Sequence, residues 1–285
     1  MLVRNPVNPR QVSRVSLSPE VVDGFVFWTK NPAPMIPWLD KLPDCPYYFQ
    51  VTLTPYDEQI ERYLPSKRKV ILPAMCQLAR QIGPERVVWR YDPVFLTERY
   101  SVDFHKKAFA QIARLLRGNT VRCVISFLDW YPPMEKRLRP LAPRPLGGDE
   151  MRELAASFGQ AAAENGMRIF TCAETADLSG FGVEHGCCID RDLLERIGGR
   201  PLCAEKDRSQ RAACGCVQSV DIGAYDTCPG GCLYCYADHG VGRTMRNLAG
   251  FDPSSPLLCS SLRPDDTVRE RKMQSGWTEQ TTLFG

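Results

Sequence analysis

Three cysteines at short, fixed spacing are the residues of this sequence best suited to metal chemistry. Cys228, Cys232 and Cys235 follow a CxxxCxxC pattern. Gly230 and Gly231, between the first two cysteines, allow a tight loop whose backbone can approach a cofactor closely. Three thiolates on such a loop can hold three corners of a 4Fe-4S cubane, which leaves the fourth iron without a protein ligand.

An iron without a protein ligand can bind the amine and carboxylate of S-adenosylmethionine. Electron transfer then cleaves the sulfonium and releases a 5'-deoxyadenosyl radical. The spacing, the glycines and Tyr234 before the last cysteine resemble the radical S-adenosylmethionine superfamily loop, and residues 232–237 are most similar to its spore photoproduct lyase and DNA-repair-photolyase-like branch. The residues leave open a zinc knuckle and a structural or electron-transfer cluster as alternatives.

A second set of cysteines lies upstream of this loop. We expect these thiolates to hold an auxiliary 4Fe-4S cluster beside the first, so that the chain carries two clusters. A structural zinc ion and unligated thiols are the alternatives. The set consists of Cys172, Cys188, Cys214 and Cys216, with Cys187 and Cys203 as substitutes.

The elements that must position these cysteines follow an alternating pattern. From residue 20 to 174, short β-branched or aromatic runs alternate with segments whose apolar residues recur at helical spacing. This alternation predicts an α/β fold, a partial or full β/α (TIM-like) barrel with a Cys-rich C-terminal region. The predicted strands are 21–28, 47–54, 86–90, 121–127 and 167–172, and the predicted helices are 66–82, 102–117, 149–165 and 190–197.

We expect one domain in three parts. These are a β/α barrel-like part (1–174), a Cys-rich iron-sulfur region packed on it (175–250) and a mostly extended C-terminal tail (251–285). The superfamily usually carries its cysteine loop near the first strand, whereas here the loop lies late in the chain. A permuted barrel, with 217–222 as the strand that leads into the loop, would restore the usual geometry.

Polar residues follow the predicted strands. Because active sites of β/α barrels form at the carboxyl ends of the strands, we expect these residues to surround one opening. Arg90, Asp92 and Glu174 are the strongest candidates for catalytic residues there.

Several short segments outside the cysteine loop resemble one family, and they are 27–32, 89–93, 171–174, 206–207, 210–211, 214–216 and 221–223. The resemblance extends over nearly the whole chain, and the family is the uncharacterised one catalogued as domain of unknown function 1848. The resemblance implies a radical-S-adenosylmethionine-like cysteine cluster near the C-terminal end and no particular reaction. Members of the family begin with a further strand that ends in a Ser-Arg-Arg-Thr-Asp-like stretch, which this sequence does not contain.

The last residues resemble the bacterial sliding-clamp-binding peptide. Leu283 and Phe284 would fill an apolar pocket while Gln280 makes polar contacts. A tail that docks on its own domain is the alternative. Basic groups at 67–69 and 136–144 are compatible with nucleic acid as a partner.

Composition limits the remaining classes. The chain has 285 residues, of which 44% are hydrophobic and 24% charged, and this excludes disordered and fibrous proteins. No run approaches the ~18 apolar residues of a membrane helix, so we expect no membrane association and a cytoplasmic protein. We therefore expect a radical S-adenosylmethionine enzyme that acts on nucleic acid in repair or modification and receives electrons from a reductant protein. The alternative is a non-catalytic iron-sulfur or redox-sensing module associated with DNA transactions.

Overall fold

A six-stranded parallel sheet forms the main body of the computed structural model, which describes residues 1–278 without the side chains of residues 132 and 133. The strands follow one another in chain order, β3-β4-β5-β6-β7-β8, so β3 and β8 form the two edges. The predicted α/β class is confirmed. The strands are β3 (Phe25–Thr29), β4 (Tyr47–Thr52), β5 (Val87–Val94), β6 (Arg122–Phe127), β7 (Arg168–Cys172) and β8 (Val183–Gly186).

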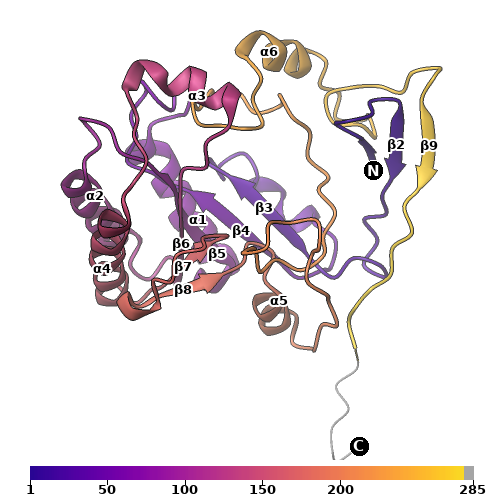
Figure 1. The fold of residues 1–285 in the computed structure, drawn as a ribbon. Helices are drawn as coiled ribbons and strands as arrows, with labels where there is room; N and C mark the ends of the chain where they lie inside the picture. The colour runs from indigo at the N-terminus through magenta and orange to yellow at the C-terminus, as the bar shows by residue number, and fades with distance from the viewer. Residues whose placement is uncertain (279–285) are drawn as a thin grey trace, which may run out of the picture.

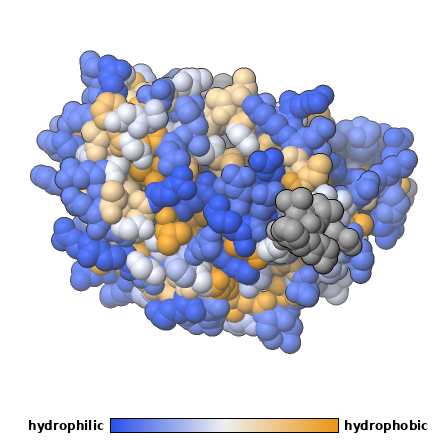
Figure 2. Space-filling view, turned by 90° about the horizontal axis from the view of Figure 1, so that it is seen from below, coloured by the Kyte–Doolittle hydropathy of each residue, from blue (hydrophilic) through white to orange (hydrophobic). Residues whose placement is uncertain are grey.

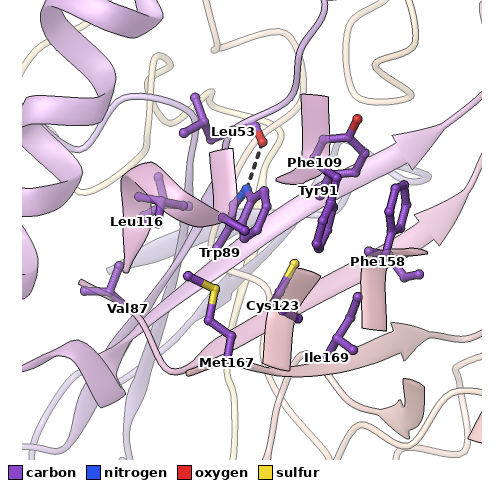
Figure 3. Close-up of a cluster of buried hydrophobic side chains, with 14 of the residues drawn as sticks. Leu53, Val87, Trp89, Tyr91, Phe109, Leu116, Cys123, Phe158, Met167 and Ile169 are labelled. Atoms are coloured by element: carbon purple, nitrogen blue, oxygen red, sulfur yellow. Dashed lines mark hydrogen bonds between the residues drawn. The ribbon is translucent and has the colours of Figure 1, made fainter. Parts of the chain in front are cut away.

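Helices cover one face of this sheet, and the largest hydrophobic core lies between these helices and the sheet. The helices are α1 (Leu72–Ile82), α2 (Val102–Leu116) and α4 (Gly148–Glu164), and α2 and α4 lie side by side in Figure 1. Trp89 and Tyr91 of β5 pack against Phe109 of α2 and Phe158 of α4 on this face (Figure 3). The Trp89 indole Nε1 donates to the Leu53 carbonyl at 2.9 Å, which satisfies its polar atom inside the core.

The opposite face of the sheet is covered at its lower part by α5 (Arg191–Gly198). Successive strand residues point to opposite faces, so Val88 and Arg90 lie on this second face while Trp89 lies on the first. Val88 packs with Leu193 and Leu194 of α5. Asp190 caps α5 by accepting a hydrogen bond from Leu193 N at 3.1 Å. Polar residues of the second face therefore remain near the carboxyl ends of the strands, above α5.

Smaller elements complete the chain. A three-stranded sheet joins β1 (Leu2–Arg4), β2 (Gln11–Arg14) and β9 (Thr267–Glu270), which brings residues near the two ends of the chain together (Figure 1). The other helices are α3 (Pro132–Leu138) and α6 (Val241–Ala249), a π-helical turn (Lys67–Ile71) and 3-10 turns at Ile36–Lys41, Pro84–Arg86, Arg139–Leu141 and Ser179–Phe181. Among the described residues, no helix has the length and hydropathy needed to cross a membrane.

The C-terminal part contacts both the small sheet and the main body. Arg4 forms an ion pair with Asp266 at 2.6 Å, and the Trp277 indole Nε1 donates to the Asp23 carbonyl at 3.1 Å. Figure 2 shows the molecule from below, the side on which α5 lies in Figure 1. This face is mostly hydrophilic, with apolar residues scattered between. Within residues 251–278, the segment predicted as a tail contributes β9 to the small sheet.

Several predicted boundaries differ from the structure. The first predicted strand begins at Phe25 rather than residue 21, because Val21 and Val22 donate to the Ser18 carbonyl in a turn. The predicted strand at 217–222 is wrong. Val217 makes only a single bridge with Lys206, and the parallel sheet ends at β8, so no strand edge pairs with the following residues.

Candidate metal centre

The cysteine loop, residues 228–235, is held by backbone pairing to the segment that follows β4. Leu233 N donates to the Ile60 carbonyl at 2.9 Å, and Tyr63 N donates to the Gly230 carbonyl at 3.1 Å. Glu61 and Cys232 form an antiparallel bridge between these contacts. The loop is therefore fixed to the carboxyl-end side of the sheet although no strand leads into it.

The two glycines of the loop differ in how much space surrounds them. A Cβ at Gly230 would lie 3.1 Å from the end of the Leu64 side chain and in van der Waals contact with Cys228 Sγ at 3.4 Å and Cys232 Sγ at 3.8 Å, so glycine keeps the space between these sulfurs free of a side chain. Gly231 has a φ of +59°, and a Cβ there would lie 2.4 Å from the Tyr63 ring. Gly231 therefore allows the loop backbone to approach the Tyr63 ring closely.

A cleft of about 370 Å³ opens beside the loop. Cys228 is exposed and borders this cleft, whereas Cys232 is buried and Cys235 is half-buried. Residues of α6 form the opposite wall, so the cleft separates the loop from that helix. The further lining residues are Tyr63, Pro229, Gly231, Asp238, Val241, Thr244 and Met245.

A buried carboxylate connects the loop to the ends of two strands. Glu61, 3% exposed, accepts hydrogen bonds from Lys30 at 2.9 Å and Thr54 at 2.8 Å, and it pairs with Lys67 and the Tyr234 hydroxyl. Lys30 also donates to the Tyr234 hydroxyl at 2.6 Å. This Glu61 network joins the residue after β3, the segment after β4 and the aromatic residue of the loop.

Charges in the network shift the acidity of its members. Burial raises the pKa of Glu61, but the positive charges of Lys30 and Lys67 outweigh this effect and leave that pKa below its ordinary value. Burial lowers the pKa of Lys67 against the opposing effect of Glu61. Burial also raises the pKa of Cys232 to about 12, while the charge of Lys30 acts in the opposite direction. The thiol of Cys232 is therefore protonated at neutral pH unless a cation binds it.

Two further charged residues hold the two ends of the loop. The Arg137 guanidinium of α3 donates to the Leu233 carbonyl at 3.0 Å and also to the carbonyls of Cys235 and Asp238. Asp226, buried and just before the loop, accepts from His239 N at 2.6 Å. Both ends of the loop are thus anchored by charged side chains.

A second thiol group lies at the carboxyl ends of β7 and β8. Cys172 Sγ and Cys188 Sγ are 3.1 Å apart. Cys216 Sγ accepts hydrogen bonds from the backbone N–H groups of Cys188 at 3.2 Å and Ile189 at 3.3 Å. We call Cys172, Cys188 and Cys216 the strand-end thiols. Cys214, the fourth cysteine of the predicted set, is buried two residues from Cys216.

Arg90 connects this second group to the sheet. Its Nη1 donates to Cys188 Sγ at 2.8 Å and to Gln50 Oε1 at 3.0 Å, and its Nε donates to Asp92 at 3.1 Å. Arg90 is only 6% exposed. The structure therefore places two of the three predicted catalytic residues together, in a network with the strand-end thiols.

Residues 1–237 match the family described as "Domain of unknown function (DUF1848)". The chain belongs to this family. The matched range of this DUF1848 protein includes both the cysteine loop and the strand-end thiols, while α6 and β9 lie beyond it. A search of curated proteins finds no match to the chain.

The residues of the loop in this DUF1848 protein fit a cubane better than a single ion. Among residues 1–278, no three His, Cys, Asp or Glu side chains lie at the spacing of one metal ion, so a single ion at the loop or at the strand-end thiols would require side-chain rotation. A cubane instead binds each cysteine to a different iron, which spreads the sulfurs across the width of the cluster. The space that a Cβ at Gly230 would fill between two sulfurs agrees with that requirement.

Glu174, the third predicted catalytic residue, lies apart from the contacts of Arg90. Its carboxylate accepts a hydrogen bond from Phe127 N at 2.8 Å at the end of β6. Burial raises its pKa above the ordinary value, with the Asp129 charge adding to this effect. The structure thus joins Glu174 to the end of β6.

Sequence reasoning did not single out Glu61, and it treated Lys67 and Arg137 as candidates for phosphate contacts. Lys67 instead donates to the Thr54 carbonyl at 3.0 Å and pairs with Glu61, and Arg137 binds loop carbonyls. No local pattern marks Glu61, because its Tyr234 partner lies 173 positions away. The clamp-like residues Gln280, Leu283 and Phe284 lie outside the described residues.

Proposed function

We propose that this DUF1848 protein is a radical S-adenosylmethionine enzyme whose cluster is held by Cys228, Cys232 and Cys235. The observation that carries the proposal is the arrangement of the CxxxCxxC loop, which is fixed by backbone pairing, bordered by a cleft, and has glycine rather than a side chain between the Cys228 and Cys232 sulfurs. A 4Fe-4S cluster held by these three thiolates would pass one electron from an external reductant to S-adenosylmethionine bound at its fourth iron.

The protein's own residues would orient and protect this chemistry. The Glu61 network fixes the Tyr234 side chain and thereby the loop between Cys232 and Cys235. Arg137 satisfies three carbonyls of the loop that would otherwise need water. Together these contacts hold the loop in one conformation, which reduces the reorganisation that binding would require.

We favour a nucleic acid lesion or modified nucleotide as the substrate class. The support is the photolyase-like loop sequence, together with Trp28, which is 50% exposed near the end of β3. Trp28 pairs in register with Gln50, so both side chains lie on the same face of the sheet as Arg90. An exposed aromatic ring can stack on a base.

The decisive test is S-adenosylmethionine cleavage by anaerobically purified, reconstituted and reduced protein. We expect 5'-deoxyadenosine to form, and Cys232→Ala to abolish it. Cys76→Ser, a change to an isolated thiol in α1, serves as the matched control. Full iron binding without cleavage, also in the presence of lesion-bearing DNA, would favour the non-catalytic iron-sulfur or redox-sensing module.

The clamp contact is a separate proposal about a partner. A peptide of the last residues should bind the bacterial sliding clamp in a fluorescence anisotropy titration, and Leu283→Ala and Phe284→Ala should weaken it. Equal binding of all three peptides would refute a specific contact.

A further inference from the structure

The strand-end thiols form a group whose geometry differs from that of the cysteine loop. They come from three separate segments, at the end of β7, just after β8, and in the connection that follows α5. Sixteen residues separate Cys172 from Cys188, and 28 separate Cys188 from Cys216. Such a convergence on one place depends on the tertiary fold.

The distance between sulfurs decides which kind of metal centre fits. Tetrahedral zinc with Zn–S bonds of about 2.3 Å places its sulfurs about 3.8 Å apart. Cys172 Sγ and Cys188 Sγ are 3.1 Å apart as hydrogen-bonded thiols, so a small side-chain rotation brings them to that spacing. A cubane would require these sulfurs to separate much further, because each would bind a different iron.

The surroundings supply donors to sulfur. Arg90 Nη1 donates to Cys188 Sγ at 2.8 Å, and two backbone N–H groups donate to Cys216 Sγ at 3.2 and 3.3 Å. Donors of this kind stabilise metal-bound thiolates and fix their orientation. Three thiolates, a divalent ion, the Arg90 guanidinium and its partner Asp92 together carry one net negative charge, which the N–H donors to sulfur offset in part.

We propose that Cys172, Cys188 and Cys216 bind a single divalent zinc-type ion that fastens the Cys-rich region to the ends of β7 and β8. Each sulfur–metal bond replaces a thiol proton, which leaves to solvent, and no electron transfer is involved. The fourth tetrahedral position is left to a further ligand, for which the buried Cys214 lies on the same segment. This site is independent of the proposed radical chemistry.

The test uses the full chain carrying Cys228→Ser, Cys232→Ser and Cys235→Ser, which removes the loop thiols and leaves the strand-end thiols unchanged. After metal removal under anaerobic, reducing conditions, it is titrated with Co²⁺ alone. We expect thiolate-to-cobalt charge transfer and the d–d bands of tetrahedral cobalt, saturating at one ion per chain and reversed by Zn²⁺.

Adding Cys188→Ser to that protein should weaken cobalt binding at least about tenfold. Adding Cys259→Ser, the matched control, should leave it unchanged. Circular dichroism reports whether each variant is folded. The parent of these variants, the protein with the three loop cysteines changed to serine, retains all the proposed ligands. Absence of tetrahedral cobalt bands in the folded parent overturns the proposal. So does purification with about four irons and four sulfides, which indicates an auxiliary cluster, or with Cys172 and Cys188 joined in a disulfide.

Discussion

The two cysteine-containing regions of this protein differ in how they are built. The cysteine loop gathers three thiols within eight residues of sequence and lines them with glycine beside an open cleft. The strand-end thiols come from distant segments and lie against a buried arginine. The loop is spacious and open on one side, whereas the second region is compact and closely packed.

The charges around the two regions differ in the same way. Glu61 beside the loop is paired with two lysines whose side chains are 19% and 25% exposed, so their ammonium groups reach towards water. Arg90 beside the strand-end thiols is 6% exposed and cannot lose its proton. A lysine can respond to the loss of its partner by moving or deprotonating, but a buried guanidinium cannot.

The largest effect that we expect is therefore Asp92→Ala. Removing this carboxylate leaves the Arg90 guanidinium buried and without its counter-charge, which should lower the free energy of unfolding by about 3–5 kcal/mol. Urea unfolding followed by circular dichroism measures this change. Glu61→Ala should cost less, about 1–3 kcal/mol, because Lys30 and Lys67 can turn towards solvent. An equal or larger cost for Glu61→Ala would contradict the contrast that we draw between the two regions.

A pH dependence that belongs to neither thiol region comes from His105. This side chain is fully buried between Tyr91 and the Phe95 carbonyl, and burial lowers its pKa from 6.5 to about 4. The unfolded chain binds the proton more strongly, so the stabilisation is present above pH 6.5 and is lost as pH falls towards 4. The loss should reach about 3 kcal/mol at the lower end of this range.

Unfolding titrations at several pH values measure the His105 effect, with His105→Gln as the variant that should flatten the profile. Serine substitution of the three loop cysteines should leave the slope between these pH values unchanged. If the dependence of the free energy of unfolding on pH changes when the loop cysteines are replaced, the surroundings of His105 and the cysteine loop are coupled.

Arg137→Ala tests how the cysteine loop is held. Three carbonyls of the loop and its exit lose a charged donor, which should destabilise the loop by about 2 kcal/mol. Amide hydrogen exchange should become faster in residues 228–238 and stay unchanged in β7 and β8. Faster exchange at the strand-end thiols as well would mean that the two regions open as one unit.

The smallest effect on stability is expected for Gly230→Ala. This change should alter the free energy of unfolding by no more than about 1 kcal/mol, yet greatly reduce iron binding, because its methyl group fills the space between Cys228 and Cys232. Gly242→Ala in α6, where a Cβ has only the tip of Arg246 within 3.8 Å, is the matched control. Iron counted after anaerobic reconstitution should fall only for Gly230→Ala. An unchanged iron content of Gly230→Ala would show that a cluster does not need the space between the Cys228 and Cys232 sulfurs.

Much of the sheet could be predicted from local patterns. The alternation of β-branched runs with helical periodicity located five of its strands and the helices α1, α2, α4 and α5. It missed β8, because Val183–Gly186 is too short and too polar to stand out, and it missed the small sheet, whose strands β2 and β9 are far apart in the chain.

For the candidate centre, the sequence by itself determined which loop could hold a cluster, because cysteine spacing and glycine placement act within a few residues. It also grouped Cys172, Cys188 and Cys216, but it could not distinguish a cluster from a single ion. Only the tertiary structure decided the distance between the Cys172 and Cys188 sulfurs and the partners of Glu61, Arg90 and Arg137. These contacts depend on how strands and loops distant in sequence are brought together, and no local spacing encodes that arrangement.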